Sequence, residues 1–429
     1  MSRIFYIASC ILSCLCLEAN ARQWTLRECI DYARTNNIQV QNAQLNQALA
    51  EETLLQAQAA RYPTLNASSS QNAAFTHGVN PIYNGNYALQ SGVTIYNGGR
   101  ISSSIRQAEL NAQASGYDIE AARMDIEVAV TQAYLNILYA KEKVTTARNN
   151  SESSKAQWER AKAMYEEGSI SLSEYAQMES QYSSDLYQQT SSESSLAQLT
   201  LNLKQLLELG LEEEFEVFYP EIGDEEVVTA LPTVAEVYNV AEEMLPDMKS
   251  GRLGIESAKL SEEIAASAGI PSISASASVS TANVYGGVTS FTDQLKNNLG
   301  AGVGLTLSIP IINNRSVRTS KAKAKLQTQQ AALSYASSQK NLVSTLEGLY
   351  QDVVSAQSRY QAAQKKLQSA ELSYTLVNEK YNEGMINPVE LLTEKNTYVA
   401  AQQELLQAKY QAILSLQLLN FYQGIPIEL

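Results

Sequence analysis

The chain has 429 residues, a formal net charge of −14 and a sequence pI of about 4.8. This acidic balance argues against a nucleic-acid-binding protein, which needs a basic surface to neutralise phosphates. His77 is the only histidine, so neither a His-based catalytic triad nor a multi-histidine metal site can be built. Enzyme activity is therefore not expected.

The start of the chain predicts a signal peptide at residues 1–21. A basic residue precedes an apolar core from Ile4 to Leu17, and Ala19-Asn20-Ala21 has the small-x-small pattern of a cleavage site. A lipoprotein signal that ends before Cys14 is the alternative. The mature chain would keep only Cys29 and could not form an internal disulfide. No later run of about 18 apolar residues predicts a helical membrane span.

The rest of the chain is an internal duplication. Ala60-Arg61-Tyr62-Pro63 returns as Ala268-Gly269-Ile270-Pro271, and Tyr165-Glu166-Glu167-Gly168 returns as Tyr381-Asn382-Glu383-Gly384. A repeat of this kind predicts one structural unit built twice. The expected segments are a first repeat at 22–209, an acidic connecting segment at 210–232 and a second repeat at 233–429.

Each repeat is expected to open with a helix. Thr25 and Glu28 have the spacing of a capping box, and Pro63 ends the helical pattern, so one helix is predicted over 24–61. Pro63 and its counterpart Pro271 are then the joints between helix and strand.

Two predicted strands follow each joint. In the first repeat they span 64–75 and 86–97, with a loop between them at 77–85. In the second repeat, apolar residues alternate with Ser, Gly or Thr from Ile273 to Ser280 and from Leu299 to Ile309. A period of two over about ten residues matches a transmembrane β-strand with one apolar and one small or polar face. A half-buried strand of a soluble sandwich is the alternative.

A long helical hairpin is expected to complete each repeat. The first helix, at 98–167, would be roughly 100 Å long at 1.5 Å per residue. It returns at about 172–209, and the second repeat has predicted helices at 313–382 and 389–423. Apolar residues step by three and four, as in a coiled coil, so these helices should pack side by side along their length.

Four strands cannot close a barrel, and lipid does not tolerate an open sheet edge. Closure needs about eight strands, so several copies must share one barrel, and three copies would supply twelve strands. The predicted fold is mainly α with membrane β: a long α-helical barrel continuous with a β-barrel shared between protomers, four strands from each chain. Such a tube is a conduit.

The duplicated plan, the two proline joints and the two Tyr-x-x-Gly turns resemble the TolC family of outer-membrane efflux proteins over about residues 24–424. The resemblance implies a homotrimeric channel-tunnel in the outer membrane of a Gram-negative bacterium, with its helical part in the periplasm. It implies a passive exit duct of a tripartite efflux or type I secretion system, without cofactor, bound metal or catalysis. The implied partners are a periplasmic adaptor (membrane fusion) protein, an inner-membrane pump of the RND, ABC or MFS type, and outer-membrane lipid.

The resemblance also assigns candidate site residues. The turns at the periplasmic tip, expected to contact the adaptor, contain Tyr165, Gly168, Tyr381 and Gly384. The acidic residues expected to ring a closed aperture are Glu174, Glu390 and, one helical turn further on, Glu394. Rings of carboxylates favour cations. The alternative is that a Glu in the first turn of a helix only complements the helix dipole.

A soluble periplasmic coiled-coil adaptor or scaffold protein is the competing interpretation of the whole chain. It would explain the helical hairpins. It would not explain four strands in which Ser or Gly alternates with Val, Ile or Leu.

Overall fold

The computed structural model describes residues 23–75, 77, 81–210, 212–220, 223, 227–286 and 289–427. The predicted signal peptide, with Cys14, lies outside these residues, as do parts of the acidic connecting segment. The chain divides into two compact units. The first comprises the residues up to 42, 121–244 and 341–429, and the second comprises 43–120 and 245–340. Each unit therefore draws segments from both repeats.

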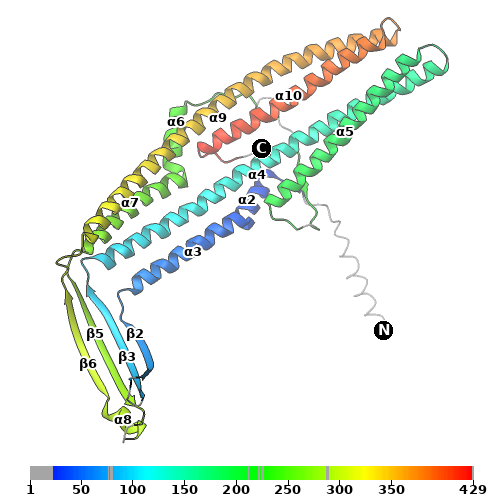
Figure 1. The fold of residues 1–429 in the computed structure, drawn as a ribbon. Helices are drawn as coiled ribbons and strands as arrows, with labels where there is room; N and C mark the ends of the chain where they lie inside the picture. Colours follow the sequence, from blue (N-terminus) through cyan, green and yellow to red (C-terminus); the bar gives the residue numbers. More distant parts are fainter. Residues whose placement is uncertain are drawn as a thin grey trace, which may run out of the picture. The chain divides into compact units, whose positions relative to one another are not determined.

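The two repeats have the same order of elements (Figure 1). The first repeat contains α2 (Leu26–Asn36), α3 (Ile38–Ala59), β2 (Thr64–Ala74), β3 (Ile82–Tyr96), α4 (Arg100–Glu166) and α5 (Leu172–Leu206). The second contains α6 (Val234–Met244), α7 (Pro246–Ser267), β5 (Ser272–Val284), α8 (Phe291–Asn297), β6 (Gly300–Ser308), α9 (Ser316–Asn382) and α10 (Pro388–Tyr422). Within the described residues, no helix combines the length and the apolar character needed to cross a membrane.

The corresponding helices of the two repeats have equal lengths. Both α2 and α6 have 11 residues, and both α3 and α7 have 22 residues. Both α4 and α9 have 67 residues, and both α5 and α10 have 35 residues. The repeats therefore differ in length only between the first helices and the hairpin, where the second repeat has the additional helix α8.

The prediction of one helix over 24–61 is wrong, because the helix breaks at Asn37. The backbone of Asn37 is extended, with ψ at 136°. Its side-chain oxygen accepts a hydrogen bond from the Gln39 N–H at 2.8 Å, and its amide donates to the Leu206 carbonyl at 3.0 Å. An amide that bonds to nearby backbone competes with helical hydrogen bonds. The predicted capping box of Thr25 and Glu28 is confirmed.

The second repeat breaks at the equivalent position by different chemistry. Leu245 is extended and makes no side-chain cap, and Pro246 is the first residue of α7. Proline lacks an N–H and disfavours helical geometry at the preceding residue. Asn37 in one repeat and Pro246 in the other therefore produce the same break.

The second unit contains a four-stranded antiparallel sheet with the order β2-β3-β5-β6. Pairing of β2 with β3 runs from Thr64 opposite Gly92 to Ala74 opposite Ile82. The predicted loop at 77–85 is therefore too long, because Ile82 to Gly85 continue the ladder. The strands predicted in the second repeat are confirmed.

The sheet has one apolar face. Residues directly opposite each other on neighbouring strands share a face, and so do residues two apart on one strand. The pairing places these apolar residues on one face: Leu65, Leu89, Val93, Ile273, Val279, Val303, Leu305 and Leu307. It places these small or polar residues on the other: Asn66, Ser68, Gln90, Ser274, Ser276, Ser278, Gly302 and Thr306. Val303 is 90% exposed, so no described residue covers the apolar face at that point.

Four helices of the second unit leave one end of the sheet in the order of the strands (Figure 1). Gln107 of α4 donates to the Ser261 hydroxyl of α7 at 2.6 Å, and Arg252 of α7 donates to the Tyr335 hydroxyl of α9 at 2.9 Å. The order is thus α3, α4, α7, α9. The outer helices α3 and α9 carry exposed leucines on the unit's two edges, with Leu49 at 65% and Leu333 at 72% exposure.

The first unit has a packed core around α2. The two-residue strands β1 (Gln23–Trp24) and β4 (Glu216–Val217) pair in parallel, so the connecting segment is tied to the residues just before α2. The Tyr134 hydroxyl donates to the carbonyls of Trp24 and Phe218 beside this pair. Cys29 is fully buried here, and burial followed by the nearby Glu28 charge raises its pKa to about 12. The thiol is a packing residue.

Replacing Asn37 by Ala should destabilise the protein by roughly 0.5–2 kcal/mol, the usual cost of losing a helix cap. The variant loses the bond to the Gln39 N–H and leaves the Leu206 carbonyl without its donor. Asn37→Asp keeps the acceptor but not the donor, so its thermal midpoint in detergent should fall between those of Asn37→Ala and the native protein. Equal midpoints for all three proteins would show that this side chain does not hold the break.

Candidate functional site

The first long hairpin turns at Gly168. The Gly168 N–H donates to the Tyr165 carbonyl at 2.9 Å, and the Ser169 N–H donates to the Met164 carbonyl at 2.8 Å. This pair of bonds is a Schellman motif, which requires a left-handed residue after the helix. Gly168 has φ at +74°, the region that favours glycine.

The second hairpin repeats this geometry at Gly384. Its N–H donates to the Tyr381 carbonyl at 3.0 Å, and the Met385 N–H donates to the Lys380 carbonyl at 2.9 Å. Gly384 also has φ at +74°. The Tyr-x-x-Gly spacing is thus the spacing between the accepting carbonyl and the donating glycine of the motif.

Glu174, a predicted aperture residue, takes part in a capping box at the start of α5. Its carboxylate accepts from the Ser171 N–H at 2.8 Å and from the Ser171 hydroxyl at 2.9 Å. These bonds, the backbone bond first, lower the pKa of Glu174. The carboxylate therefore stays ionised further into acid than an ordinary Glu.

The two predicted acids of α10 are placed differently. Asn387 caps the helix, accepting from the Glu390 N–H at 3.0 Å, and Pro388 is its first residue. The Glu390 side chain is exposed and makes no hydrogen bond or ion pair with any described residue. Glu394 is half-buried and accepts from the Ser373 hydroxyl of α9 at 2.9 Å. Of these two carboxylates, Glu390 is the one without a partner in the described part of the chain.

All four hairpin helices meet in an apolar cluster beside the turns. Its fully buried members are Ala161 of α4, Met178 of α5 and Leu391 of α10. The partly buried residues around them are Trp158, Ile170, Tyr374, Val377, Tyr381 and Leu392. Tyr381 of the second turn thus anchors that turn by its side chain as well as by its carbonyl.

Two stacked aromatic pairs flank this cluster at matching repeat positions. Trp158 stacks on Tyr182 with ring centroids 5.4 Å apart. Tyr374 stacks on Tyr398 with centroids 5.3 Å apart. Tyr374 and Tyr398 occupy the positions in the second repeat that match Trp158 and Tyr182 in the first. The duplication therefore extends to side-chain packing. Such pairs contribute about 0.5–1.5 kcal/mol each beyond their buried area.

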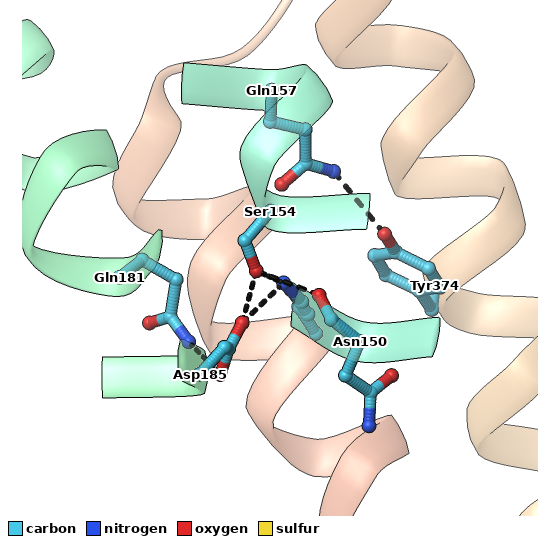
Figure 2. A network of polar contacts seen from close by, with 7 residues as sticks. Asn150, Ser154, Gln157, Gln181, Asp185 and Tyr374 are labelled. Atoms are coloured by element: carbon cyan, nitrogen blue, oxygen red, sulfur yellow. Dashed lines mark hydrogen bonds and ion pairs between the residues drawn. The ribbon is translucent and has the colours of Figure 1, made fainter. Parts of the chain in front are cut away.

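Figure 2 shows a polar cluster around Ser154 and Asp185, near Gln157, whose amide donates to the Tyr374 hydroxyl at 3.3 Å. Lys395 of α10 is 2% exposed and pairs with the Asp185 carboxylate of α5 at 2.8 Å. The ammonium also donates to the hydroxyl of Ser154 on α4. Gln181 donates to the other oxygen of Asp185 at 3.0 Å. A lysine on the second hairpin is thus held inside by a carboxylate and a hydroxyl of the first.

The matching positions of the other repeat supply no equivalent cluster. The counterparts of Ser154, Asp185 and Lys395 are Ala370, Ala401 and Glu179. The sequence patterns did not predict this cluster. The available signal was Lys395 itself, because it follows Leu391 by four positions and precedes Tyr398 by three, which places a charge on the apolar stripe of α10.

The described part of the chain contains no cluster of three or more His, Cys, Asp or Glu residues that could hold a metal ion. The turns instead combine an apolar cluster, capped helix starts and charged side chains. It presents an exposed carboxylate at Glu390, a capped one at Glu174 and a buried ion pair deeper in the hairpins.

Comparison with known proteins agrees with this architecture. A family model described as "Outer membrane efflux protein" matches residues 29–208 and 237–424. No curated protein matches the chain. The matching crystal structures include CusC, with a TM-score of 0.81, 18% identity and coverage of 94% of this chain and 92% of that one. The outer membrane protein VceC from Vibrio cholerae has a TM-score of 0.77, 17% identity and coverage of 94% and 97%. The Campylobacter jejuni CmeC outer membrane channel has a TM-score of 0.75, 20% identity and coverage of 93% and 85%.

These likenesses show that the predicted fold, a channel-tunnel protomer with a small β part, is confirmed. The resemblance stated from the sequence is confirmed as well. The matched family and structures are described as efflux proteins and membrane channels rather than enzymes.

Replacing Lys395 by Met should lower stability by about 3–5 kcal/mol, because it leaves the Asp185 carboxylate buried without its cation. The double variant Lys395→Met/Asp185→Leu should recover most of this loss. Thermal unfolding midpoints in detergent measure both effects.

Lys366→Met is the matched control on the same hairpin. Lys366 pairs with Glu404 at 2.7 Å, but both side chains are about half exposed, so its loss should cost at most about 1 kcal/mol. Equal effects at Lys395 and Lys366 would contradict a distinct role for the buried pair.

Proposed function

Because the chain belongs to the outer membrane efflux protein family and is an outer-membrane efflux channel, we propose that three copies form one continuous exit duct. Each copy contributes four strands to a shared twelve-stranded barrel and its long helices to a periplasmic tube. The observation that carries this proposal is the pair of open edges on the second unit.

The open edges are those of β2 and β6, which pair on one side only within the described residues. An unpaired edge presents a row of N–H and C=O groups that lipid cannot satisfy. Four strands are too few to close on themselves, since closure needs about eight. Pairing of β6 of one copy with β2 of the next removes every edge.

The helices next to these edges support the same assembly. The exposed leucines of α3, such as Leu49, and of α9, such as Leu333, continue the two edges beyond the sheet. Exposed apolar stripes on long helices require a partner. Neighbouring copies that meet at the sheet edges bring these helices together.

The apolar face of the sheet is long enough to cover much of a membrane band. Along β5 it runs from Ile273 to Val279, about 20 Å of strand at 3.3 Å per residue, and strands of outer-membrane barrels tilt by roughly 35–45° across an apolar band about 25 Å tall. Exposed tyrosines border it, with Tyr96 at the helical end and Tyr83 at the far end. Aromatic rings at both borders are typical of membrane interfaces. The opposite face, rich in Ser and Gly, then lines the lumen.

The partners that we propose are a periplasmic adaptor and an inner-membrane pump of the RND, ABC or MFS type. The adaptor contacts the turns around Gly168 and Gly384. Exposed apolar residues lie next to both turns, including Leu172 and Met385, and such residues favour a protein contact. The pump supplies the energy, and the duct conducts passively without a cofactor.

The acidic constriction that we propose rests mainly on Glu390. Three-fold symmetry converts each predicted acid into a ring of three carboxylates, which selects cations. Glu390 is exposed and has no partner among the described side chains, so its full charge is available to the path. The Glu174 carboxylate accepts a hydrogen bond from Ser171, and the Glu394 carboxylate accepts one from Ser373. These two acids are therefore weaker candidates for the constriction than Glu390.

Single-channel recording in planar bilayers tests the conduit and its acidic ring. The native protein should give small, cation-selective steps. Glu390→Gln should reduce cation selectivity, because it removes three charges from the constriction. Glu174→Gln is the matched control at the equivalent repeat position and should change selectivity less. A native channel with unchanged selectivity in Glu390→Gln would remove Glu390 from the path.

The mass of the purified protein in detergent tests the assembly itself. Three copies should migrate as one heat-resistant particle, and Leu333→Glu should weaken it, because the charge enters a contact between copies. A native protein that stays monomeric in lipid vesicles would contradict the shared barrel.

A further inference from the structure

The helix α8 has no counterpart among the described residues of the first repeat. It lies at the end of the sheet opposite to the end from which α3, α4, α7 and α9 leave (Figure 1). Two contacts fix which face of the sheet it covers. The hydroxyl of Thr281 donates to the Leu295 carbonyl at 2.7 Å, and the ring of Phe291 meets the ring of Tyr87 edge-on with centroids 6.5 Å apart.

These contacts place α8 on the apolar face. Tyr87 lies directly opposite Thr281 in the ladder, and Leu89 lies directly opposite Val279. Residues two apart on a strand share a face, so Tyr87 and Thr281 share the face of Leu89 and Val279. The helix therefore lies beyond the outer end of the apolar band and not over the Ser- and Gly-rich face.

The position of α8 is held by hydrogen bonds to the end of β5. The Gln294 side chain accepts from the Val284 N–H at 2.7 Å and donates to the Val284 carbonyl at 3.1 Å. Asn298 donates to the Ala282 carbonyl at 2.7 Å, and Ser290 caps the start of the helix. The connection between β5 and β6 is thus attached to the end of β5 by side chains from the middle of α8 and from its C-cap.

Beside α8 the apolar face becomes polar. Asn283 lies two residues after Thr281, is 1% exposed, and neither its side-chain nitrogen nor its oxygen has a partner among the described residues. A Cβ on the facing Gly85 would lie 2.4 Å from the Asn283 oxygen, so glycine makes room for this amide. Gln71 donates to the Tyr87 hydroxyl at 2.9 Å across the same face. Exposure of an unpaired amide to hydrocarbon is unfavourable, because hydrocarbon offers no hydrogen bonds in place of those to water.

We propose that α8 is an interfacial element on the lipid-facing side of the barrel, seated at the boundary between acyl chains and headgroups of the outer leaflet. Its partner is membrane lipid. The helix separates the Asn283 amide from the acyl chains and presents Phe291 to them, while its exposed charges, Asp293 and Lys296, face the headgroups and water. This proposal rests on the proposed function, because it requires the apolar face to meet lipid.

Three features of the chain favour lipid as the occupant of this position. The face that α8 covers is the same face of the sheet as the apolar band, directly beyond the end of that band. Phe291 stays 47% exposed although it packs on Tyr87, and the neighbouring Tyr83 and Tyr285 are also exposed. Aromatic rings beside charged groups are the composition of membrane interfaces. One consequence is that α8 itself does not lie over the Ser- and Gly-rich face of the sheet.

Spin labelling in lipid vesicles tests the position of α8. Cys29, the one cysteine among the described residues, is buried, so single cysteines can be introduced and labelled selectively. The test position is Phe291→Cys. Val303→Cys marks the middle of the apolar face, Ser278→Cys marks the opposite face, and Lys296→Cys marks the charged side of α8. Accessibility to oxygen, which partitions into lipid, is compared with accessibility to a water-soluble nickel complex.

The label at 291 should show a ratio of oxygen to nickel accessibility between the ratios at 303 and 278, as expected for a shallow lipid position. The label at 296 should be more accessible to the nickel complex than to oxygen. If 303 has the lipid signature but 291 matches 278, α8 faces water and the inference is overturned. If 303 itself lacks the lipid signature, the shared barrel fails instead. The two proposals are thereby distinguished.

Discussion

The structure depends on one constraint, which is that a single layer cannot satisfy its own edges or bury its own faces. The sheet of the second unit ends in β2 and β6, each paired on one side among the described residues. The helices that leave the sheet keep the same order and carry exposed leucines on the same two edges. In the proposed barrel the apolar face meets acyl chains and the two edges pair with strands of other copies. The proposed contacts between copies, at the sheet edges and along the outer helices, thus follow from one requirement.

The turns at the other end of the long helices follow from local backbone chemistry instead. Each helix stops where Gly168 or Gly384 adopts a left-handed conformation and closes a Schellman motif onto a tyrosine carbonyl. The returning helix then begins with a side-chain cap from Ser171 or Asn387. The backbone bonds that define each turn thus lie within the turn itself. The acidic side chains in the first turn of the returning helices differ: Glu174 is hydrogen-bonded to Ser171, whereas Glu390 is exposed.

The elements that the sequence predicted well are those with a regular pattern of residues over many consecutive positions. The helix expected over 98–167 spans Arg100–Glu166, because a run almost free of Gly and Pro with apolar residues every three or four positions has one low-energy conformation. The break at Asn37 and the Lys395 cluster escaped prediction for a common reason. The Asn37 side chain bonds to the nearby Gln39 N–H but also to the Leu206 carbonyl, and Lys395 bonds to Ser154 and Asp185; Leu206, Ser154 and Asp185 all lie on helices far away in the sequence. Which distant partner meets a polar side chain is a property of packing. The helix α8 was missed because so short a helix in a polar loop carries too little periodicity.

The duplication also explains how a specific link could arise in one half only. The repeats reach the same helix break with Asn37 or Pro246, and the same aromatic stack with Trp158–Tyr182 or Tyr374–Tyr398. The fold therefore tolerates different chemistry at equivalent positions. The ion pair of Lys395 is an example, because it joins α10 to the first hairpin of the same chain. The matching positions of the other repeat hold only alanines and a glutamate. In the proposed trimer this gives three strong links inside the chains, while contacts between copies rest on apolar edges. Any opening of the tip that separates copies can then leave the ion pairs intact, whereas one that separates the two hairpins of a chain has to break a buried charge pair.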